Sequence, residues 1–273
     1  MSVSRIKSLA IAALVLINVF FLTLIIHDSV TDARSERQAL ENAVTVLENA
    51  GIIIDPSDII THGTLRTMRT TRNIEAEERI AQAALGSTVM TEHGLIYVHE
   101  SDRGRASFGH DGTFDISLNE DVVTNANGTL RAVERLLRDM RIEVLDNLHL
   151  YGRPGAETVV ADLAYKGVGV FNSAIRFEFI DGSLRAITGR NITVIETAED
   201  TTEISSVSTA LLGFLAEVRR GDYEAMWIKR VEAGYFYRVG EGVLVPVWLI
   251  TANGIDYIID GETGNIEARP NPQ

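Results

Sequence analysis

The chain has 273 residues, of which 45% are hydrophobic and 23% are charged, and it contains no cysteine. The absence of cysteine excludes disulfides, thiolate zinc sites and thiol catalysis. The formal net charge is −13. Such an acidic surface repels phosphate backbones, so the composition argues against nucleic-acid binding.

The first feature along the chain is an uncharged apolar run over residues 9–26. As a helix it spans about 27 Å, which is close to the thickness of the hydrocarbon core of a bilayer. Two basic residues precede the run, and His27 and Asp28 follow it. Because positive residues stay on the cytoplasmic side, we expect a cytoplasmic tail over residues 1–8, a single transmembrane helix over residues 9–26, and the rest of the chain outside the cytoplasm.

A cleaved signal peptide is the rival interpretation of this run. The apolar region of a signal peptide is shorter, at ~7–15 residues, and it ends at a site of the A-x-A type. The best nearby site here is Thr31-Asp32-Ala33, which is a poor match. The sequence therefore favours an uncleaved anchor.

Beyond the anchor, apolar side chains recur at helical and at strand spacing. The helices are expected over residues 32–50, 75–85, 129–142 and 203–220. The strands are expected over residues 64–74, 94–100, 105–108, 114–118, 158–166, 174–180, 183–188, 228–239, 243–251, 255–260 and 265–268.

Three Asp-Gly turns recur in similar surroundings, HDGTFDI, IDGSLRAI and IDGETGNI. Chance recurrence is the alternative, but a helix followed by a hairpin recurs with them. We therefore expect an α+β fold with an N-terminal transmembrane helix followed by repeated helix-on-antiparallel-sheet modules. The extracellular helix and first module would cover residues 27–122, the second module 123–200 and the C-terminal module 201–273.

No catalytic motif is present: we find no G-x-S-x-G, Walker loop, H-E-x-x-H or S-x-x-K. His93 and His99 fall on one face of an expected strand and could bind a metal together with Asp111, although solvated histidines are the more common case. We therefore expect no catalytic residue, no cofactor and no metal, and a protein that is not an enzyme.

Aromatic residues gather near the C-terminus. On strands they most often form core or a half-exposed face of a sheet. Tyr235, Trp248 and Tyr257 are the candidates for an extracellular interaction site, if they are exposed.

Motifs at the two ends of the chain resemble the YycI family and its relative YycH, which are regulatory proteins of an essential two-component system in Gram-positive bacteria. At the start, VSRIK over residues 3–7 leads into LINVFFL over 16–22. At the end come Gly234-Tyr235, LVPVW over 244–248 and YIIDGETG over 257–264. This ending is also similar to PepSY-type modules. The family often has two Tyr before the last turn, whereas Ile258 follows Tyr257 here, and the middle of the chain matches in layout only.

The resemblance implies a non-enzymatic, membrane-anchored regulator of a sensor histidine kinase in a system that controls cell-envelope metabolism. In the family, the extracellular domain pairs with a YycH-like partner protein and the membrane helix packs against the membrane helices of the kinase. Polar side chains within a membrane often bond to a neighbouring helix. The candidate contacts in the bilayer are therefore Ile17, Asn18, Phe20 and Phe21, although Asn18 could also bond within its own helix. The alternative function is an extracellular PepSY-type binding or inhibitor module tethered to the membrane.

Overall fold

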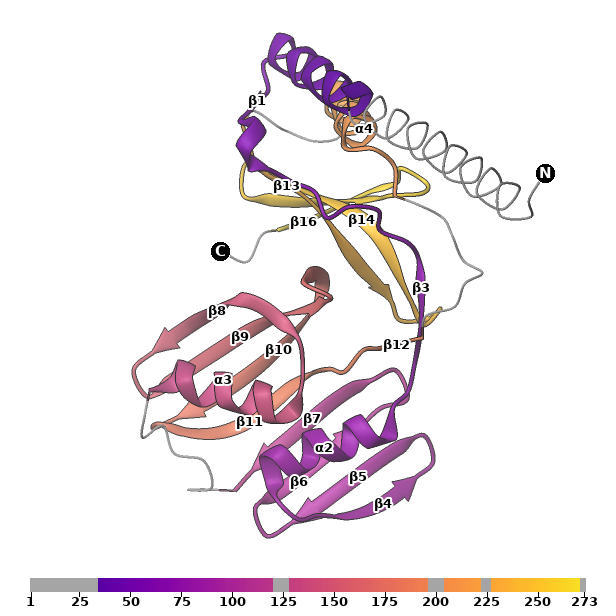
Figure 1. Cartoon of the computed structure of the whole chain (residues 1–273). Coiled ribbons are helices and arrows are strands. Elements are labelled where there is room, and N and C mark those ends of the chain that lie inside the picture. Colours follow the sequence, from indigo (N-terminus) through magenta and orange to yellow (C-terminus); the bar gives the residue numbers. More distant parts are fainter. Residues whose placement is uncertain (1–33, 120–127, 196–203, 222–226, 271–273) are drawn as a thin grey trace, which may run out of the picture. The chain divides into compact units, whose positions relative to one another are not determined.

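The computed structural model describes residues 34–119, 128–195, 204–221 and 227–270 (Figure 1). They belong to two compact units, Met1–Pro56 with Ser206–Ile228 and Ser57–Ser205 with Lys229–Gln273. The predicted membrane helix over residues 9–26 and the predicted module boundaries at residues 122 and 200 lie outside the described residues and stay predictions. In the described ranges, no helix has both the length and the apolar character that a membrane crossing needs.

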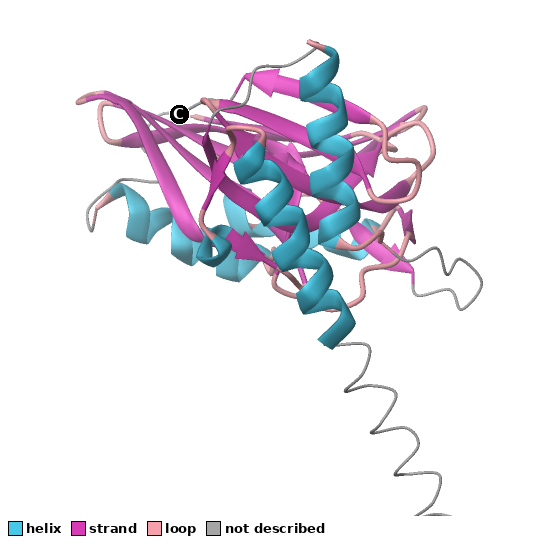
Figure 2. Cartoon of the chain, turned by 90° about the horizontal axis from the view of Figure 1, so that it is seen from above, coloured by secondary structure: helices cyan, strands magenta, loops and turns pink. Residues whose placement is uncertain are grey.

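The first unit contains two helices that lie side by side (Figures 1 and 2), one over residues 34–49 and the other α4 (Val207–Arg220). Each buries one apolar face: Ala43, Val44 and Leu47 on the first helix, and Ala210, Leu211, Phe214 and Leu215 on α4. Ser206 caps α4 by accepting the N–H of Thr209 at 3.3 Å. At the other end of α4, Gly221 takes the left-handed conformation. The short strand β1 (Ile53–Ile54) pairs in parallel with Trp227 and Ile228.

The second unit is made mostly of strands. Residues 56–58 form a 3-10 turn before it. In chain order its strands are β2 (Ile59–Ile60), β3 (Met68–Thr71), β4 (Val89–His93), β5 (Ile96–Ser101), β6 (Gly104–Phe108), β7 (Thr113–Leu118), β8 (Val144–Arg153), β9 (Ala156–Tyr165), β10 (Val168–Ile180), β11 (Ser183–Arg190), β12 (Thr193–Ile195), most of β13 (Trp227–Arg238), β14 (Val243–Ala252), β15 (Ile255–Asp260) and β16 (Ile266–Pro270).

These strands form one large mixed sheet, which corrects the fold class predicted from the sequence. The main path is β12-β3-β14-β13-β10-β11-β7-β6-β5-β4. The pairings of β13 with β2 and with β10 are parallel, whereas separate antiparallel modules were expected. β7 pairs with β11 along five residue positions, so the hairpins that were assigned to separate modules share one continuous sheet. The prediction of repeated, self-contained helix-on-sheet modules was therefore wrong.

Two helices cover parts of this sheet (Figure 1). α2 (Ile74–Leu85) packs on β5, β6 and β7, and α3 (Thr129–Met140) packs on β9 and on α2. Asn73 caps α2 by accepting the N–H of Ala76 at 3.0 Å. Their apolar faces complete a core in which Ile80, Val133 and Phe177 are fully buried.

β10 pairs with different strands along its length. From Ala174 to Ile180 it pairs with β9, but the register is interrupted between Gly169 and Ala174, and Val170 pairs in parallel with Tyr235 of β13. Within the interruption, the side chain of Asn172 takes the place of a backbone partner. Its Nδ2 donates to the carbonyl oxygen of Tyr237 at 2.8 Å, and the N–H of Tyr237 donates to its Oδ1 at 2.8 Å. One side chain thereby continues the pairing of β10 with β13 across the bulge.

We predict that Asn172→Ala lowers the free energy of unfolding by about 1–3 kcal/mol, because both backbone groups of Tyr237 lose their partner. Urea denaturation of the wild type and the variant measures this difference. Asn147→Ala is the matched control, because Asn147 is exposed on β8. Equal stability of the two variants would show that the Asn172 bonds contribute nothing.

Candidate functional site

Two groups of residues were expected to make contacts with partners. Ile17, Asn18, Phe20 and Phe21 lie outside the described residues, so their role in the bilayer stays a prediction.

The second group is buried. Tyr235, Trp248 and Tyr257 are 5%, 3% and 1% exposed. The indole Nε1 of Trp248 donates to the carbonyl oxygen of Ser205 at 2.9 Å. Burial raises the pKa of Tyr235, whose ring lies edge-on to Tyr165 with centroids 6.3 Å apart. All three belong to the core, which is the alternative that the sequence left open, so they are not exposed for a partner contact.

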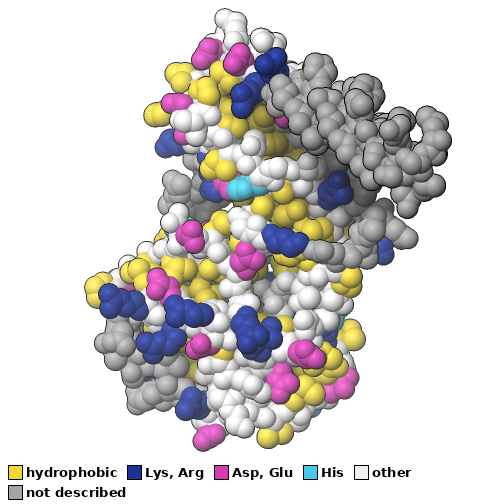
Figure 3. All heavy atoms as spheres, in the orientation of Figure 1, with side chains coloured by type: hydrophobic (Ala, Val, Ile, Leu, Met, Phe, Trp, Pro, Cys, Tyr) yellow, Lys and Arg dark blue, Asp and Glu magenta, His cyan; other side chains and the backbone are white. Residues whose placement is uncertain are grey.

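The exposed apolar surface of the second unit lies elsewhere, on the hairpin of β4 and β5. All five residues of β4 are exposed, and among the described strands β4 pairs only with β5, at one end of the main path. The exposed fractions are 71% for Val89, 50% for Met90, 67% for Leu95 and 47% for Ile96. Figure 3 shows hydrophobic side chains at the surface at the lower end of the view, where Figure 1 places β4 and β5. An open, apolar edge strand is a template for pairing with another chain.

Arg72 holds this hairpin in place. Its guanidinium makes a two-point ion pair with Glu77 of α2, at 2.8 and 2.9 Å, and that carboxylate is almost completely buried. The same group donates to the carbonyl oxygens of Leu95 and Phe108 and lies 4.1 Å from the centre of the Tyr97 ring. The hydrogen bond to Glu77 raises the pKa of Arg72. One arginine thus ties the turn of the hairpin to α2 and β6.

His99 lies in the interior of the same hairpin. It is 1% exposed, its ring packs edge-on against Phe108, and its Nδ1 lies 3.2 Å from the hydroxyl of Thr88. Its Nε2 is buried without a hydrogen-bond partner in the described part of the chain. Burial lowers the pKa of His99, while Glu78 and Glu77 act in the opposite direction. Folding therefore favours the neutral ring.

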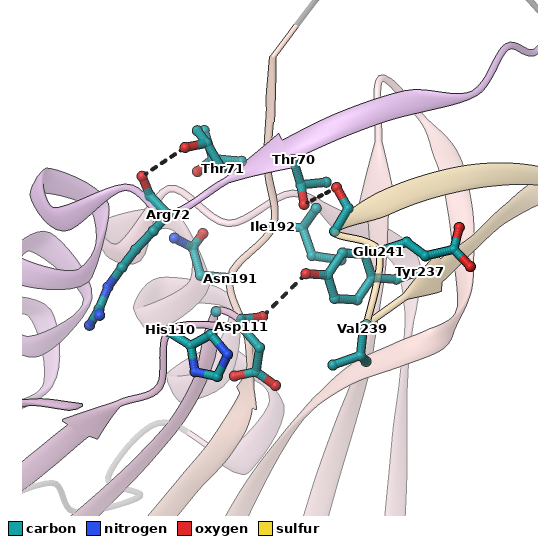
Figure 4. A pocket seen from close by; sticks show the side chains of 14 residues that line it. Thr70, Thr71, Arg72, His110, Asp111, Asn191, Ile192, Tyr237, Val239 and Glu241 are labelled. Atoms are coloured by element: carbon teal, nitrogen blue, oxygen red, sulfur yellow. Dashed lines mark hydrogen bonds between the residues drawn. The ribbon is translucent and has the colours of Figure 1, made fainter. Parts of the chain in front are cut away.

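A small polar pocket of about 260 Å³ lies where four segments of the second unit meet (Figure 4). Its wall includes β3, the turn between β6 and β7, the connection from β11 to β12, and the turn between β13 and β14. The hydroxyl of Tyr237 donates to the carbonyl oxygen of Asp111 at 3.4 Å, and Thr70 donates to Gly242 at 2.8 Å. The side chains of Asn191 and His110 face this pocket with no hydrogen bond to any described residue.

Asp111 is the charged centre of the pocket. Its Oδ1 accepts the N–H and the hydroxyl of Thr113, and its Oδ2 lies 3.4 Å from the guanidinium of Arg190, which in turn lies over the ring of Tyr237. Burial alone would raise the pKa of Asp111, but the Thr113 bonds and Arg190 lower it below its usual range. The pocket therefore presents the carboxylate of Asp111, the amide of Asn191 and the imidazole of His110, which suit a small polar molecule.

The described residues contain no group of three or more His, Asp and Glu side chains that could hold a metal ion. Of the residues that the sequence placed near one another, His93 is exposed on β4 and His99 is buried on β5.

Sequence reasoning missed the hairpin edge and the pocket. One signal for the edge was available, because apolar pairs at Val89-Met90 and Leu95-Ile96 flank the polar segment Thr91–Gly94. The pocket had no comparable signal, since its residues come from four distant segments.

No family model matches the chain, and no curated protein matches it. Among solved structures, the chain is similar to an uncharacterized protein from Eubacterium rectale ATCC 33656. The two share 10% sequence identity with a TM-score of 0.49, over 79% of this chain and 92% of the other.

We predict that the hairpin becomes less stable as pH falls below about 6.5, the ordinary pKa of histidine. The unfolded chain then binds a proton at His99 that the folded chain binds only at lower pH, so the free energy of unfolding falls with pH until the folded-state pKa is passed. Urea denaturation at pH 7.5 and at pH values below 6.5 measures this slope. His99→Gln should flatten the slope, and His93→Gln, at an exposed position, should leave it unchanged. An unchanged slope in His99→Gln would contradict the assignment.

Proposed function

We propose that the chain is a non-enzymatic, membrane-anchored regulator of a sensor histidine kinase in a two-component system that controls cell-envelope metabolism. In this proposal it works by binding other proteins, with the extracellular part meeting a YycH-like partner and residues 9–26 meeting the membrane helices of the kinase. Support from the sequence comes from the apolar run and from the YycI-like motifs. The observation that carries the proposal is the exposed apolar edge of the β4–β5 hairpin.

The hairpin suits a protein partner because it offers two kinds of contact. The free edge of β4 presents backbone N–H and C=O groups to an added strand, and alternate side chains supply specificity. The hairpin is also fixed before binding, since Arg72 donates to the turn at Leu95 and lies over the ring of Tyr97, while its own guanidinium is paired with Glu77 of α2. A fixed edge loses less conformational entropy when a partner binds.

The free energy gained by burying this edge does not by itself exceed the cost of association. Full burial of a large apolar side chain contributes about 1.5–3 kcal/mol, so covering four side chains that are 47–71% exposed contributes roughly 4–7 kcal/mol. Association itself costs about 4–15 kcal/mol. A shared bilayer raises the effective concentration of two anchored partners and so offsets part of that cost. A weak edge contact between anchored proteins is therefore sufficient for regulation.

The second candidate is an extracellular binding module tethered to the membrane. The polar pocket around Asp111 favours it, because Asn191 and His110 remain available to a ligand there. In that case the chain would act on a soluble or cell-wall component and would not need the kinase.

We predict that the double variant Val89→Glu with Leu95→Glu loses co-purification of the YycH-like partner from native membranes and changes kinase-dependent transcription. Two carboxylates on the edge place unpaired charge in the contact, which costs several kcal/mol on binding. The matched control is Leu150→Glu with Ile180→Glu, since these two side chains are 50% and 49% exposed on other strands of the same unit.

The control variant should behave as the wild type at equal protein level. If the hairpin variant also keeps both the partner and the transcriptional output, the edge is not the contact. If the wild type brings down neither the partner nor the kinase, the regulator proposal fails and the tethered binding module takes its place.

A further inference from the structure

Hydrogen bonds between its four segments hold the polar pocket together. The backbone N–H of Asn191, after β11, donates to the carbonyl oxygen of Gly112, in the turn between β6 and β7, at 2.8 Å. The N–H and the hydroxyl of Thr70 on β3 both donate to the carbonyl oxygen of Gly242, in the turn between β13 and β14, at 2.8 Å. The pocket therefore has its shape before a ligand binds, which reduces the entropy that binding costs.

The charged side chains in the wall of the pocket are compensated by the chain itself. The pairs are Asp111 with Arg190 at 3.4 Å, Glu241 with Arg238 at 3.6 Å and Arg72 with Glu77 at 2.8 Å. Glu241 is also 62% exposed, so water and salt screen its charge. A charged ligand would have to compete with one of these pairs, and the wall therefore favours a ligand without net charge.

The polar groups that remain for a ligand include both donors and acceptors. The side chains of Asn191 and His110 face the pocket and make no hydrogen bond to any described residue (Figure 4). An amide carries two donor hydrogens and an acceptor oxygen, and a neutral imidazole carries one donor and one acceptor. The carboxylate of Asp111 is an acceptor, because its pKa is held below the usual range. Its Oδ2 makes a long contact of 3.4 Å with Arg190 and can accept a further hydrogen bond.

Hydroxyl groups match this wall, because each of them donates and accepts at the same time. Several hydroxyls on one rigid ring can bond to the amide, the imidazole and the carboxylate without bringing a charge. Ile192 and Val239 line the same pocket and offer apolar surface to the C–H groups of a ring (Figure 4). The volume of about 260 Å³ lies just below the range of drug-sized sites, about 300–1,000 Å³, so the pocket suits a single ring.

We infer that this pocket binds a neutral sugar ring, with its hydroxyls at Asn191, His110 and Asp111 and its C–H groups on Ile192 and Val239. A site whose polar groups bond to hydroxyls discriminates strongly against an analogue that lacks them. The ring is either a free monosaccharide or the end of a glycan, which present the same chemistry. The inference gives the ligand class for the second candidate function and does not rest on the regulator proposal.

The test uses the full chain in nanodiscs, with empty nanodiscs as the reference, and titrations followed by saturation-transfer difference NMR. The neutral probes are glucose, galactose, mannose and N-acetylglucosamine. We expect at least one of them to bind with a roughly millimolar Kd, as is usual for so small a ligand. The amino-sugar and uronic-acid counterparts of that sugar, and cyclohexanol, should bind at least roughly tenfold more weakly.

Asn191→Leu removes the amide but keeps the backbone bond to Gly112, and it should weaken binding of that sugar by at least roughly tenfold. The matched control is Asn147→Leu, at an exposed position on β8, which should bind as the wild type. Thermal unfolding verifies that each variant is folded. If Asn191→Leu does not fold, His110→Ala at an exposed position replaces it and should weaken binding several-fold.

The methyl glycoside of the best-binding sugar distinguishes the two sources of the ring, because its linkage mimics that of a glycan. Binding equal to that of the free sugar indicates the end of a glycan. Loss of binding indicates a free monosaccharide. Both results support a sugar site in the pocket.

Four results would overturn the inference. They are the absence of binding by any neutral sugar at tens of millimolar, equal binding of cyclohexanol, tighter binding of a charged counterpart, and unchanged binding in the folded pocket variant. The partner and the kinase take no part in this measurement, so its failure is distinct from a failure of the regulator proposal.

Discussion

The sheet of the second unit depends on the two hydrogen bonds by which the side chain of Asn172 joins β10 to β13. A strand that changes partners leaves backbone groups unpaired, and buried groups of that kind are costly. The amide of Asn172 satisfies the N–H and C=O of Tyr237, so the ladder continues across the bulge. The geometry of the polar pocket follows in part from this pair of bonds. On β13 it fixes Tyr237, whose hydroxyl reaches Asp111 in the polar pocket. On β10 it spans the interruption of the β9–β10 ladder between Gly169 and Ala174.

Much of the local structure could be predicted from the sequence, because it depends on neighbouring residues. Helical spacing identified α2 and α3, observed at Ile74–Leu85 and Thr129–Met140. The Asp181-Gly182 turn forms with both residues at positive φ, 49° and 78°, as a two-residue hairpin requires. Pro246 has no N–H to donate to a ladder, and it falls where β14 changes its partner from β3 to β15. Strand pairing over long distances carries no local signal, so the parallel contacts of β13 and the β7–β11 junction were not predicted.

The sites could be predicted less well than the fold. Aromatic content near the C-terminus suggested a partner surface at Tyr235, Trp248 and Tyr257, but composition does not distinguish a covered face of a sheet from an open one. The exposed edge instead depends on the order of the sheet, in which α2 packs on β5, β6 and β7 and β4 lies at the end of the path. The sequence placed Arg72 within the expected strand over residues 64–74 and gave it no further role. Its role comes from contacts with Glu77, Leu95 and Phe108, which lie up to 36 residues away along the chain.

We propose that the β4–β5 hairpin is the surface where a partner protein binds. A photoreactive amino acid at Leu95, in the full chain in native membranes, tests this proposal. We expect a crosslink to the YycH-like partner or to the kinase from position 95, and none from the same residue placed at Leu150. Equal crosslinking from both positions, or none from position 95 while the partner still co-purifies, would contradict it.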